Sequence, residues 1–187
     1  MSKLKISPNI FIYPMPVTLL GTKNVDKANF MALGWITRIN ANPPLLAIGV
    51  NKTHLSNQKI KENKCFSINF PNQGMIVETD FCGLVSGKNR DKSEIFTVFY
   101  GELKDAPMIE ECPLSMECRL VDFHELATND LFIGEIINVY TEKEYLTDST
   151  IDIKKINPLL LTMPDNQYWS VGENLGKAWN IGKKLKK

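Results

Sequence analysis

Short apolar runs that end at turn-forming residues are the feature that most constrains how this chain can fold. In the first half of the chain they cover residues 17–21, 30–39, 45–50 and 65–70. Pro43 and Pro44 precede the third run, and Pro71 follows the fourth. Runs this short with such boundaries are typical of β-strands rather than helices. We therefore predict a strand at each of the four.

The second half of the chain predicts a hairpin and one more strand. Residues 114–126 and 131–140 alternate in part between apolar and polar side chains. Thr128, Asn129 and Asp130 lie between them, and residues of these types favour tight turns. The two segments should therefore pair as antiparallel strands. Residues 159–163 predict a further strand.

Helical signals are fewer than strand signals. Residues 57–63 form a short polar segment, and Ser56 is placed to cap its N-terminus. Residues 74–84 predict a second helix. Residues 173–185 predict a weaker one, because Gly176 and Gly182 interrupt it.

Many short strands with few helices favour a mainly β fold, an antiparallel barrel, over alternating β-α units. The chain has 187 residues, which fits a single domain spanning 1–187. No G-x-G-x-x-G motif opens a nucleotide-binding sheet. The nearest phosphate-loop candidate, residues 82–89, has Cys82 and Asn89 where that loop needs Gly and Ser or Thr.

Charge and hydrophobicity exclude several classes of protein. Lys and Arg number 22 and Asp and Glu 21, so the net charge of +1 argues against a nucleic-acid partner. No apolar run reaches 18 residues, so no membrane-spanning helix is expected. The first residues lack a signal-peptide pattern, because Ser7, Pro8 and Asn9 break any apolar run. We expect a cytoplasmic protein.

The chain offers few chemical groups of its own for catalysis. It has no G-x-S-x-G motif, and its four cysteines form no C-x-x-C pair, so we expect no metal site. Cys118 and His124 should share one face of a strand but lie about 20 Å apart, too far for a nucleophile and its base. An enzyme built on this chain would need a cofactor to carry the reaction.

The most informative stretch is residues 51–58, which follows a strand and opens a helix. Free backbone N–H groups at a helix start favour an anion. Lys52 adds charge, Thr53 and Ser56 add hydroxyl donors, and His54 can donate from its ring. These features predict a phosphate cradle. The alternative is an ordinary capped helix with solvated neighbours.

Two other stretches could contact a ligand. Cys82, Gly83, Ser86, Gly87 and Lys92 lie in a Gly-containing segment with three cations, which would let the backbone approach a ligand closely. The alternative is a mobile basic surface loop. Residues 28–35 suit a strand lying against something flat, and the alternative is a core strand with Trp35 packed inside.

In order and spacing these stretches resemble the flavin reductase-like proteins of the FMN-binding split-barrel fold, and within them the flavoredoxin group. The matching segments are Asn29-Phe30-Met31-Ala32, Asn42-Pro43-Pro44, His54-Leu55-Ser56, residues 66–71, Cys82-Gly83, Ser86-Gly87, Asp91-Lys92 and residues 132–136. The resemblance covers about residues 8–140 well. His54 stands where similar proteins often have Arg, so phosphate binding would depend more on Lys52, Ser56 and the helix start.

The resemblance implies an antiparallel, Greek-key-like split barrel that forms a homodimer and binds FMN without a covalent bond near the subunit interface. FMN would carry the chemistry, with NADH, NADPH or a protein as donor and a flavin, ferric complex or protein as acceptor. The alternatives are a flavin-binding electron carrier without turnover and an interaction module without ligand. The cofactor-binding residues would be Asn29, Phe30, Met31, Ala32, Asn51, Lys52, Thr53, His54, Ser56, Cys82, Gly83, Ser86, Gly87 and Lys92.

Overall fold

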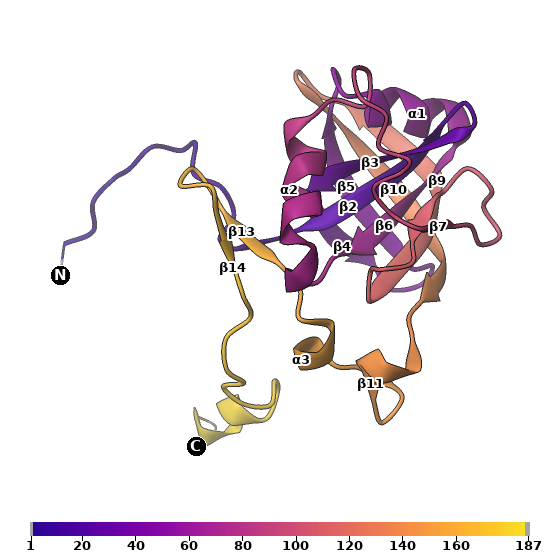
Figure 1. Cartoon of the computed structure of the whole chain (residues 1–187). Coiled ribbons are helices and arrows are strands. Elements are labelled where there is room, and N and C mark those ends of the chain that lie inside the picture. The colour runs from indigo at the N-terminus through magenta and orange to yellow at the C-terminus, as the bar shows by residue number, and fades with distance from the viewer. Residues whose placement is uncertain (1, 186–187) are drawn as a thin grey trace.

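A seven-stranded antiparallel sheet forms the body of the protein in a computed structural model that describes residues 2–185 (Figure 1). Its strands run in the order β3-β2-β6-β9-β10-β5-β4. Their bounds are β2 (Thr18–Asn24), β3 (Lys27–Leu33), β4 (Ile36–Asn40), β5 (Leu45–Asn51), β6 (Cys65–Phe70), β9 (Leu114–Glu125) and β10 (Asn129–Tyr140). The predicted antiparallel, mainly β fold is confirmed.

The two edge strands, β3 and β4, follow each other in the chain and are joined only by Gly34 and Trp35. The prediction of one strand over residues 30–39 is therefore wrong. Leu33 ends the pairing of β3 with β2, and Ile36 begins the pairing of β4 with β5. Trp35, at this corner, is 47% exposed instead of packed inside.

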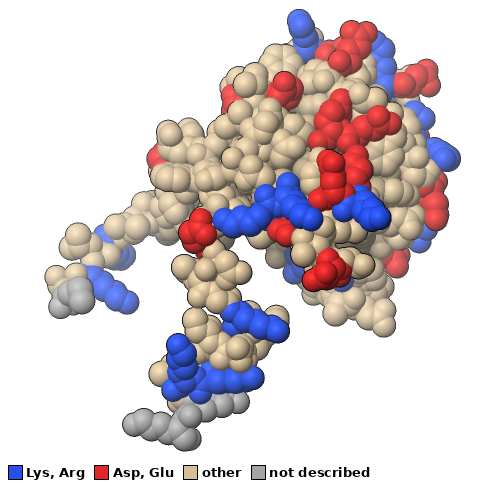
Figure 2. Space-filling model, turned by 60° about the horizontal axis from the view of Figure 1, so that its bottom comes forward, with Lys and Arg blue, Asp and Glu red and all other residues tan. Residues whose placement is uncertain are grey.

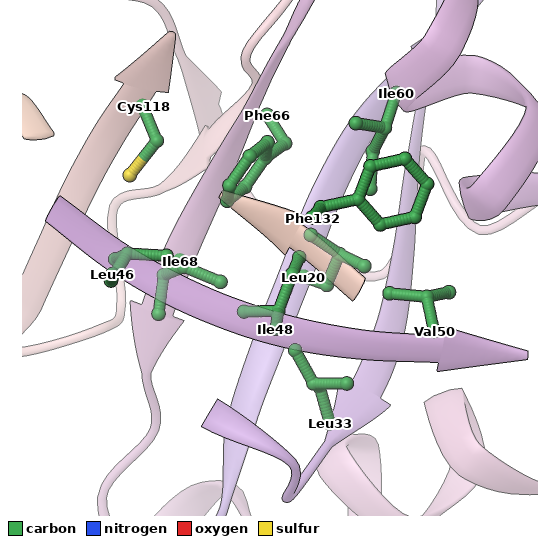
Figure 3. Close-up of a cluster of buried hydrophobic side chains, with 10 residues drawn as sticks. All are labelled: Leu20, Leu33, Leu46, Ile48, Val50, Ile60, Phe66, Ile68, Cys118 and Phe132. Atoms are coloured by element: carbon green, nitrogen blue, oxygen red, sulfur yellow. The ribbon is translucent and has the colours of Figure 1, made fainter. Parts of the chain in front are cut away.

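The sheet curls around a cluster of buried side chains (Figure 3). Its members are Leu20, Leu33, Leu46, Ile48, Val50, Ile60, Phe66, Ile68, Cys118 and Phe132. Nine of these side chains come from strands β2, β3, β5, β6, β9 and β10. The tenth, Ile60, comes from helix α1 (Leu55–Asn63), which packs beside β2, β5 and β6. Fully burying one such side chain stabilises the fold by about 1.5–3 kcal/mol. This core fixes the position of α1.

A second buried cluster lies on the other face of β2 and β3, under helix α2 (Ile76–Leu84). Leu19 and Phe30 point into it, whereas Leu20 points into the first cluster, as the alternation along strands requires. The Phe30 and Phe96 rings meet edge to face with centroids 5.5 Å apart. The short 3-10 helix η1 (Gln73–Met75) leads into α2, so the predicted helix over residues 74–84 is confirmed.

The predicted hairpin is formed by β9 and β10, but its strands are irregular. Leu120 pairs with Gly134 and Asp122 with Ile133, so Val121 is an extra residue in β9. Such a bulge reverses the alternation beyond it. Cys118 is consequently buried while His124 is exposed, and the prediction that they share a face is wrong.

The remaining elements are short. They are β1 (Met15–Pro16), β7 (Val98–Phe99), β8 (Met108–Ile109), η2 (Lys143–Tyr145), β11 (Leu146–Thr147), β12 (Thr150–Ile151), α3 (Ile153–Ile156), β13 (Leu160–Thr162), β14 (Gln167–Trp169) and η3 (Ile181–Leu185). Strand β13 confirms the strand predicted over residues 159–163. It pairs with β1 and β14 in a separate sheet. No helix in the described part of the chain is long and apolar enough to cross a membrane.

The helix predicted over residues 173–185 is wrong apart from η3. Gly176 has φ of 143°, a conformation outside any right-handed helix. Residues 2–14 and 170–180 instead form neither helix nor strand, and both ends of the chain project from the sheet (Figure 1).

Candidate functional site

A cavity of about 210 Å³ lies between β3, the start of α1, the end of α2 and the loop that follows α2. Ten of the predicted site residues line it together: Asn29, Met31, Ala32, His54, Ser56, Cys82, Gly83, Ser86, Gly87 and Lys92. Leu55, Leu84 and Val85 complete its wall and were not among the site residues predicted from the sequence. Their apolar side chains carry no local signal that distinguishes them from core residues.

The other four predicted residues lie outside this wall. Phe30 is fully buried in the cluster under α2. The Thr53 N–H and hydroxyl both donate to Asn51 Oδ1, at 2.9 and 2.8 Å, and so shape the turn before α1. The Lys52 ammonium lies 3.6 Å from Asp130 Oδ1, a carboxylate that is buried.

The start of α1 presents unused backbone donors. His54 is the N-cap residue and makes no side-chain cap, so the prediction that Ser56 caps the helix is wrong by two residues. The Asn57 N–H already donates to the His54 carbonyl. The N–H groups of Leu55 and Ser56 have no acceptor within residues 2–185, and both residues line the cavity. Two orphan donors at a helix start favour an anion there.

The Ser56 hydroxyl is held by a side chain of β3. Asn29 Nδ2 donates to Ser56 Oγ at 3.0 Å and to Thr22 Oγ1 at 3.2 Å, and all three residues are buried. Because Ser56 Oγ accepts from Asn29, its own proton remains free for an acceptor in the cavity. Asn29 thus orients Ser56 as a donor.

Lys92 places a buried positive charge in the cavity wall. It is 3% exposed, and its Nζ donates to the carbonyls of Phe30 at 2.8 Å and Cys82 at 3.1 Å. No carboxylate in the described residues pairs with it. Burial lowers the pKa of this ammonium. A buried cation without a counterion is costly, so an anion in the cavity would compensate it.

Two nearby cations influence the protonation of the His54 ring, so an anion bound beside them would change it. Desolvation lowers the pKa of its ring below 6.5, and the nearby charges of Lys92 and Lys88 lower it further. The ring is therefore largely neutral near pH 7 in the free protein. Lys88 is fixed at the rim, where its Nζ donates to the Thr53 carbonyl at 2.7 Å.

A second, mainly apolar cavity of about 360 Å³ adjoins the first and shares Met31, Ala32 and His54 with it. Its other lining residues come from the N-terminal part of the chain, the seven-stranded sheet and the C-terminal part: Phe11, Val17, Leu33, Gly34, Trp35, Gly49, Asn51, Asn129, Leu161, Met163 and Tyr168. The Tyr168 hydroxyl donates to Asp80 Oδ1 at 2.9 Å, which ties β14 to α2. Sequence reasoning missed Tyr168, because only the fold brings the C-terminal region to this wall.

Comparison with known proteins now identifies the family. The model of the flavin reductase like domain matches residues 10–163. The chain belongs to the flavin reductase-like family. The flavoredoxin of Methanosarcina acetivorans has a solved structure that superposes with a TM-score of 0.97 at 59% identity, covering 99% of this chain and 100% of that one.

Two more distant proteins are also similar to this chain. The flavoredoxin of Desulfovibrio vulgaris (Miyazaki F) superposes with a TM-score of 0.88 at 33% identity, covering 98% of this chain and 100% of that one. An uncharacterised protein of Archaeoglobus fulgidus is 29% identical over 145 residues, which is 76% of this chain and 81% of that protein. The resemblance seen in the sequence is confirmed, and so is the split-barrel flavin reductase fold.

Within this family member the cysteines offer little reactivity. Cys65, Cys112 and Cys118 are buried away from the polar cavity, whereas Cys82 lines it. Burial raises the pKa of the Cys65 and Cys82 thiols to about 11, and it raises those of Cys112 and Cys118 as well. Thiols in this state are poor nucleophiles at neutral pH.

Proposed function

We propose that this protein binds FMN without a covalent bond and acts as a flavoprotein oxidoreductase. The observation that carries the proposal is the pairing of two cavities. One combines free helix-start N–H groups, the Ser56 hydroxyl and the buried Lys92 ammonium; the other is an adjoining apolar slot. A ligand with an anionic end and a flat apolar body fits both. FMN is such a ligand, and bound FMN supplies hydride and electron transfer.

The phosphate would be held at the start of α1. Leu55 and Ser56 would donate from their N–H groups, and Ser56 would also donate from its hydroxyl. Lys92 would supply a full charge at short range, and Lys52, whose ammonium already pairs with Asp130, would add charge at longer range. Ser86 and Gly87 would close the pocket from the loop after α2.

The isoalloxazine ring would lie against Met31 and Ala32, which line both cavities. The small side chain of Ala32 would allow the ring to approach closely. Gly83 already packs close to Ala32, because a Cβ placed at Gly83 would lie only 3.3 Å from Ala32 Cβ. Trp35 adds an aromatic side chain to the slot. In this proposal no side chain is catalytic; the protein positions the ring and excludes water.

The same proposal includes a single domain over residues 1–187, a homodimer and a cytoplasmic location, as the family resemblance and the composition favour. NADH, NADPH or a protein would donate electrons, and a flavin, a ferric complex or a protein would accept them.

Anaerobic titration of the FMN-loaded protein with NADH and with NADPH tests this function. An oxidoreductase loses its flavin absorption bands on addition of one or both nucleotides. Bound flavin that keeps its colour with both nucleotides, but is bleached by a reduced protein partner, would instead show an electron carrier. A purified protein that binds neither FMN nor FAD would overturn the proposal.

A further inference from the structure

Three charged side chains in residues 2–185 are buried, whereas the others are exposed or half-buried, and many of them lie on the face shown in Figure 2. The buried three are Lys92, Glu117 and Asp130. Lys92 lines the polar cavity, and Glu117 accepts hydrogen bonds from the N–H groups of Glu102 and Leu103 and so holds a loop. Asp130 does neither, and a buried carboxylate is costly unless its partners compensate it.

The partners of Asp130 include two residues one turn apart on α1. Asn57 Nδ2 donates to Asp130 Oδ2 at 2.9 Å, and Lys61 Nζ lies 2.8 Å from the same oxygen. The other oxygen, Oδ1, is buried without a hydrogen-bond partner, and the Lys52 ammonium lies 3.6 Å from it. Burial raises the pKa of this carboxyl, but Lys61, Asn57 and Lys52 lower it more, so its pKa lies below the usual value. Asp130 is therefore ionised at neutral pH.

Asn57 ties the first turn of α1 to two strands of the sheet. Besides its bond to Asp130 on β10, its Nδ2 group donates to the Val50 carbonyl on β5 at 3.0 Å, so both amide protons are used. Asn57 is buried and directly follows Ser56, whose hydroxyl is held by Asn29 of β3. The start of α1 is thus fixed to β3 through Ser56 and to β5 and β10 through Asn57.

We propose that Asn57 and Asp130 determine the preference of the site for a phosphorylated flavin, because they hold the free N–H groups of Leu55 and Ser56 in the orientation that binds phosphate. This inference rests on the proposed function. Neither Asn57 nor Asp130 lines the polar cavity, so both are positioning residues. Asp130 acts through Asn57, and Asn57 acts through the backbone of α1.

The effect should be confined to the phosphate. Hydrogen bonds weaken steeply as their angles depart from linear, so a small rotation of the first turn would lower phosphate affinity. Leu55 and Ser56 line the polar cavity but not the adjoining apolar slot. The contacts of the flavin ring in that slot would therefore change little.

The unpartnered oxygen of Asp130 allows its hydrogen bond to be separated from its charge. In Asp130→Asn the amide oxygen can still accept from Asn57, while the NH2 group replaces Oδ1, which accepts no hydrogen bond. Lys52 and Lys61 lose a counterion, but their side chains are exposed enough to be hydrated, at 38% and 29%. Asp130→Ala removes the hydrogen bond as well, and leaves one Asn57 proton without its acceptor.

Titration of the flavin-free protein and its variants with FMN and with riboflavin tests the inference. Asn57→Ala and Asp130→Ala should each raise the FMN dissociation constant about tenfold or more and change that of riboflavin by less than about threefold. Asp130→Asn should restore FMN binding to within about threefold of wild type. Gln58→Ala is the matched control, because this neighbouring amide is exposed and donates only to Glu62, at 2.6 Å. Circular dichroism verifies folding, and if Asp130→Ala does not fold, Asn57→Ala decides.

Equal losses for FMN and riboflavin in the Asn57→Ala protein would show a general structural role and overturn the inference. So would an Asn57→Ala protein that binds FMN as tightly as Gln58→Ala does. An Asp130→Asn protein that loses as much FMN affinity as Asp130→Ala would overturn the role of the hydrogen bond. In all three cases wild type still prefers FMN. Wild type that binds both flavins equally would overturn the proposed phosphate site together with this inference.

Discussion

Single side chains give the polar cavity its preference for an anion, and few of them could be ranked from the sequence. Ser56 was selected as a helix cap, yet its hydroxyl is instead held by Asn29, 27 residues earlier. Lys92 was one of several cations in a loop, and only the fold shows that it alone is buried there. Residue type was visible in the sequence; burial and hydrogen-bond partners depend on tertiary contacts.

His54 gives the site a predictable dependence on pH. A bound phosphate would raise the lowered pKa of its ring, so binding takes up a proton and strengthens as pH falls. We expect wild-type FMN affinity to exceed that of His54→Asn by a factor that grows between about pH 8 and about pH 6. Fluorescence titration at several pH values measures this ratio. The phosphate's own ionisation cancels in the ratio, and a ratio that does not change with pH would contradict the role of His54.

The buried cysteines should be dispensable for flavin reduction. Cys65, Cys112 and Cys118 lie away from the polar cavity with raised thiol pKa values. We expect each Cys→Ala variant to bind FMN and to be reduced anaerobically at a rate within about threefold of wild type, because buried thiols of this kind act as small apolar groups. A variant that keeps its flavin but is no longer reduced would reveal a thiol role.

At the level of elements, the apolar runs predicted that the strands exist, but they did not predict two interruptions within the strands. The corner at Gly34 and Trp35 and the bulge at Val121 depend on which strands become neighbours. The apolar run over residues 30–39 and the partial alternation over residues 114–126 continue across these two points, so each predicted strand extended across the interruption. The consequence for function is direct, since the corner brings Trp35 to the wall of the apolar slot.

The loop after α2 can be tested at Gly87. A Cβ there would lie 2.0 Å from Asn29 Oδ1, so the loop rests directly on the side chain that orients Ser56. Gly87→Ala should displace one or the other and weaken FMN binding about tenfold or more, the loss of one charge-assisted hydrogen bond. Gly172→Ala is the control, because a Cβ at Gly172 meets no atom within 4 Å. Equal affinity in the two variants would mean that the loop does not shape the site.

For the whole molecule, ligand binding should raise the free energy of unfolding. A ligand that binds only the folded state at 100 times its dissociation constant adds about 2.7 kcal/mol to the free energy of unfolding. For a chain of this size that corresponds to roughly 5–10 °C in the melting temperature. We expect FMN to produce such a shift in thermal denaturation. At equal concentration riboflavin, which lacks the phosphate, should give a smaller one, and equal shifts would place the binding energy outside the phosphate site.

The measurement that tests the FMN site most directly is a titration of the flavin-free protein with FMN and with riboflavin. Charge-assisted hydrogen bonds contribute about 1.5–3 kcal/mol each, so Ser56→Ala and Lys92→Met should weaken FMN roughly ten- to a hundredfold. Neither should change riboflavin affinity by more than about threefold, and Lys52→Ala should fall between them and wild type for FMN. Lys59→Ala, which removes a cation paired with Glu62, is the control and should bind both ligands as wild type does. Equal losses for the two flavins, or no loss for either, would contradict a phosphate site at the start of α1.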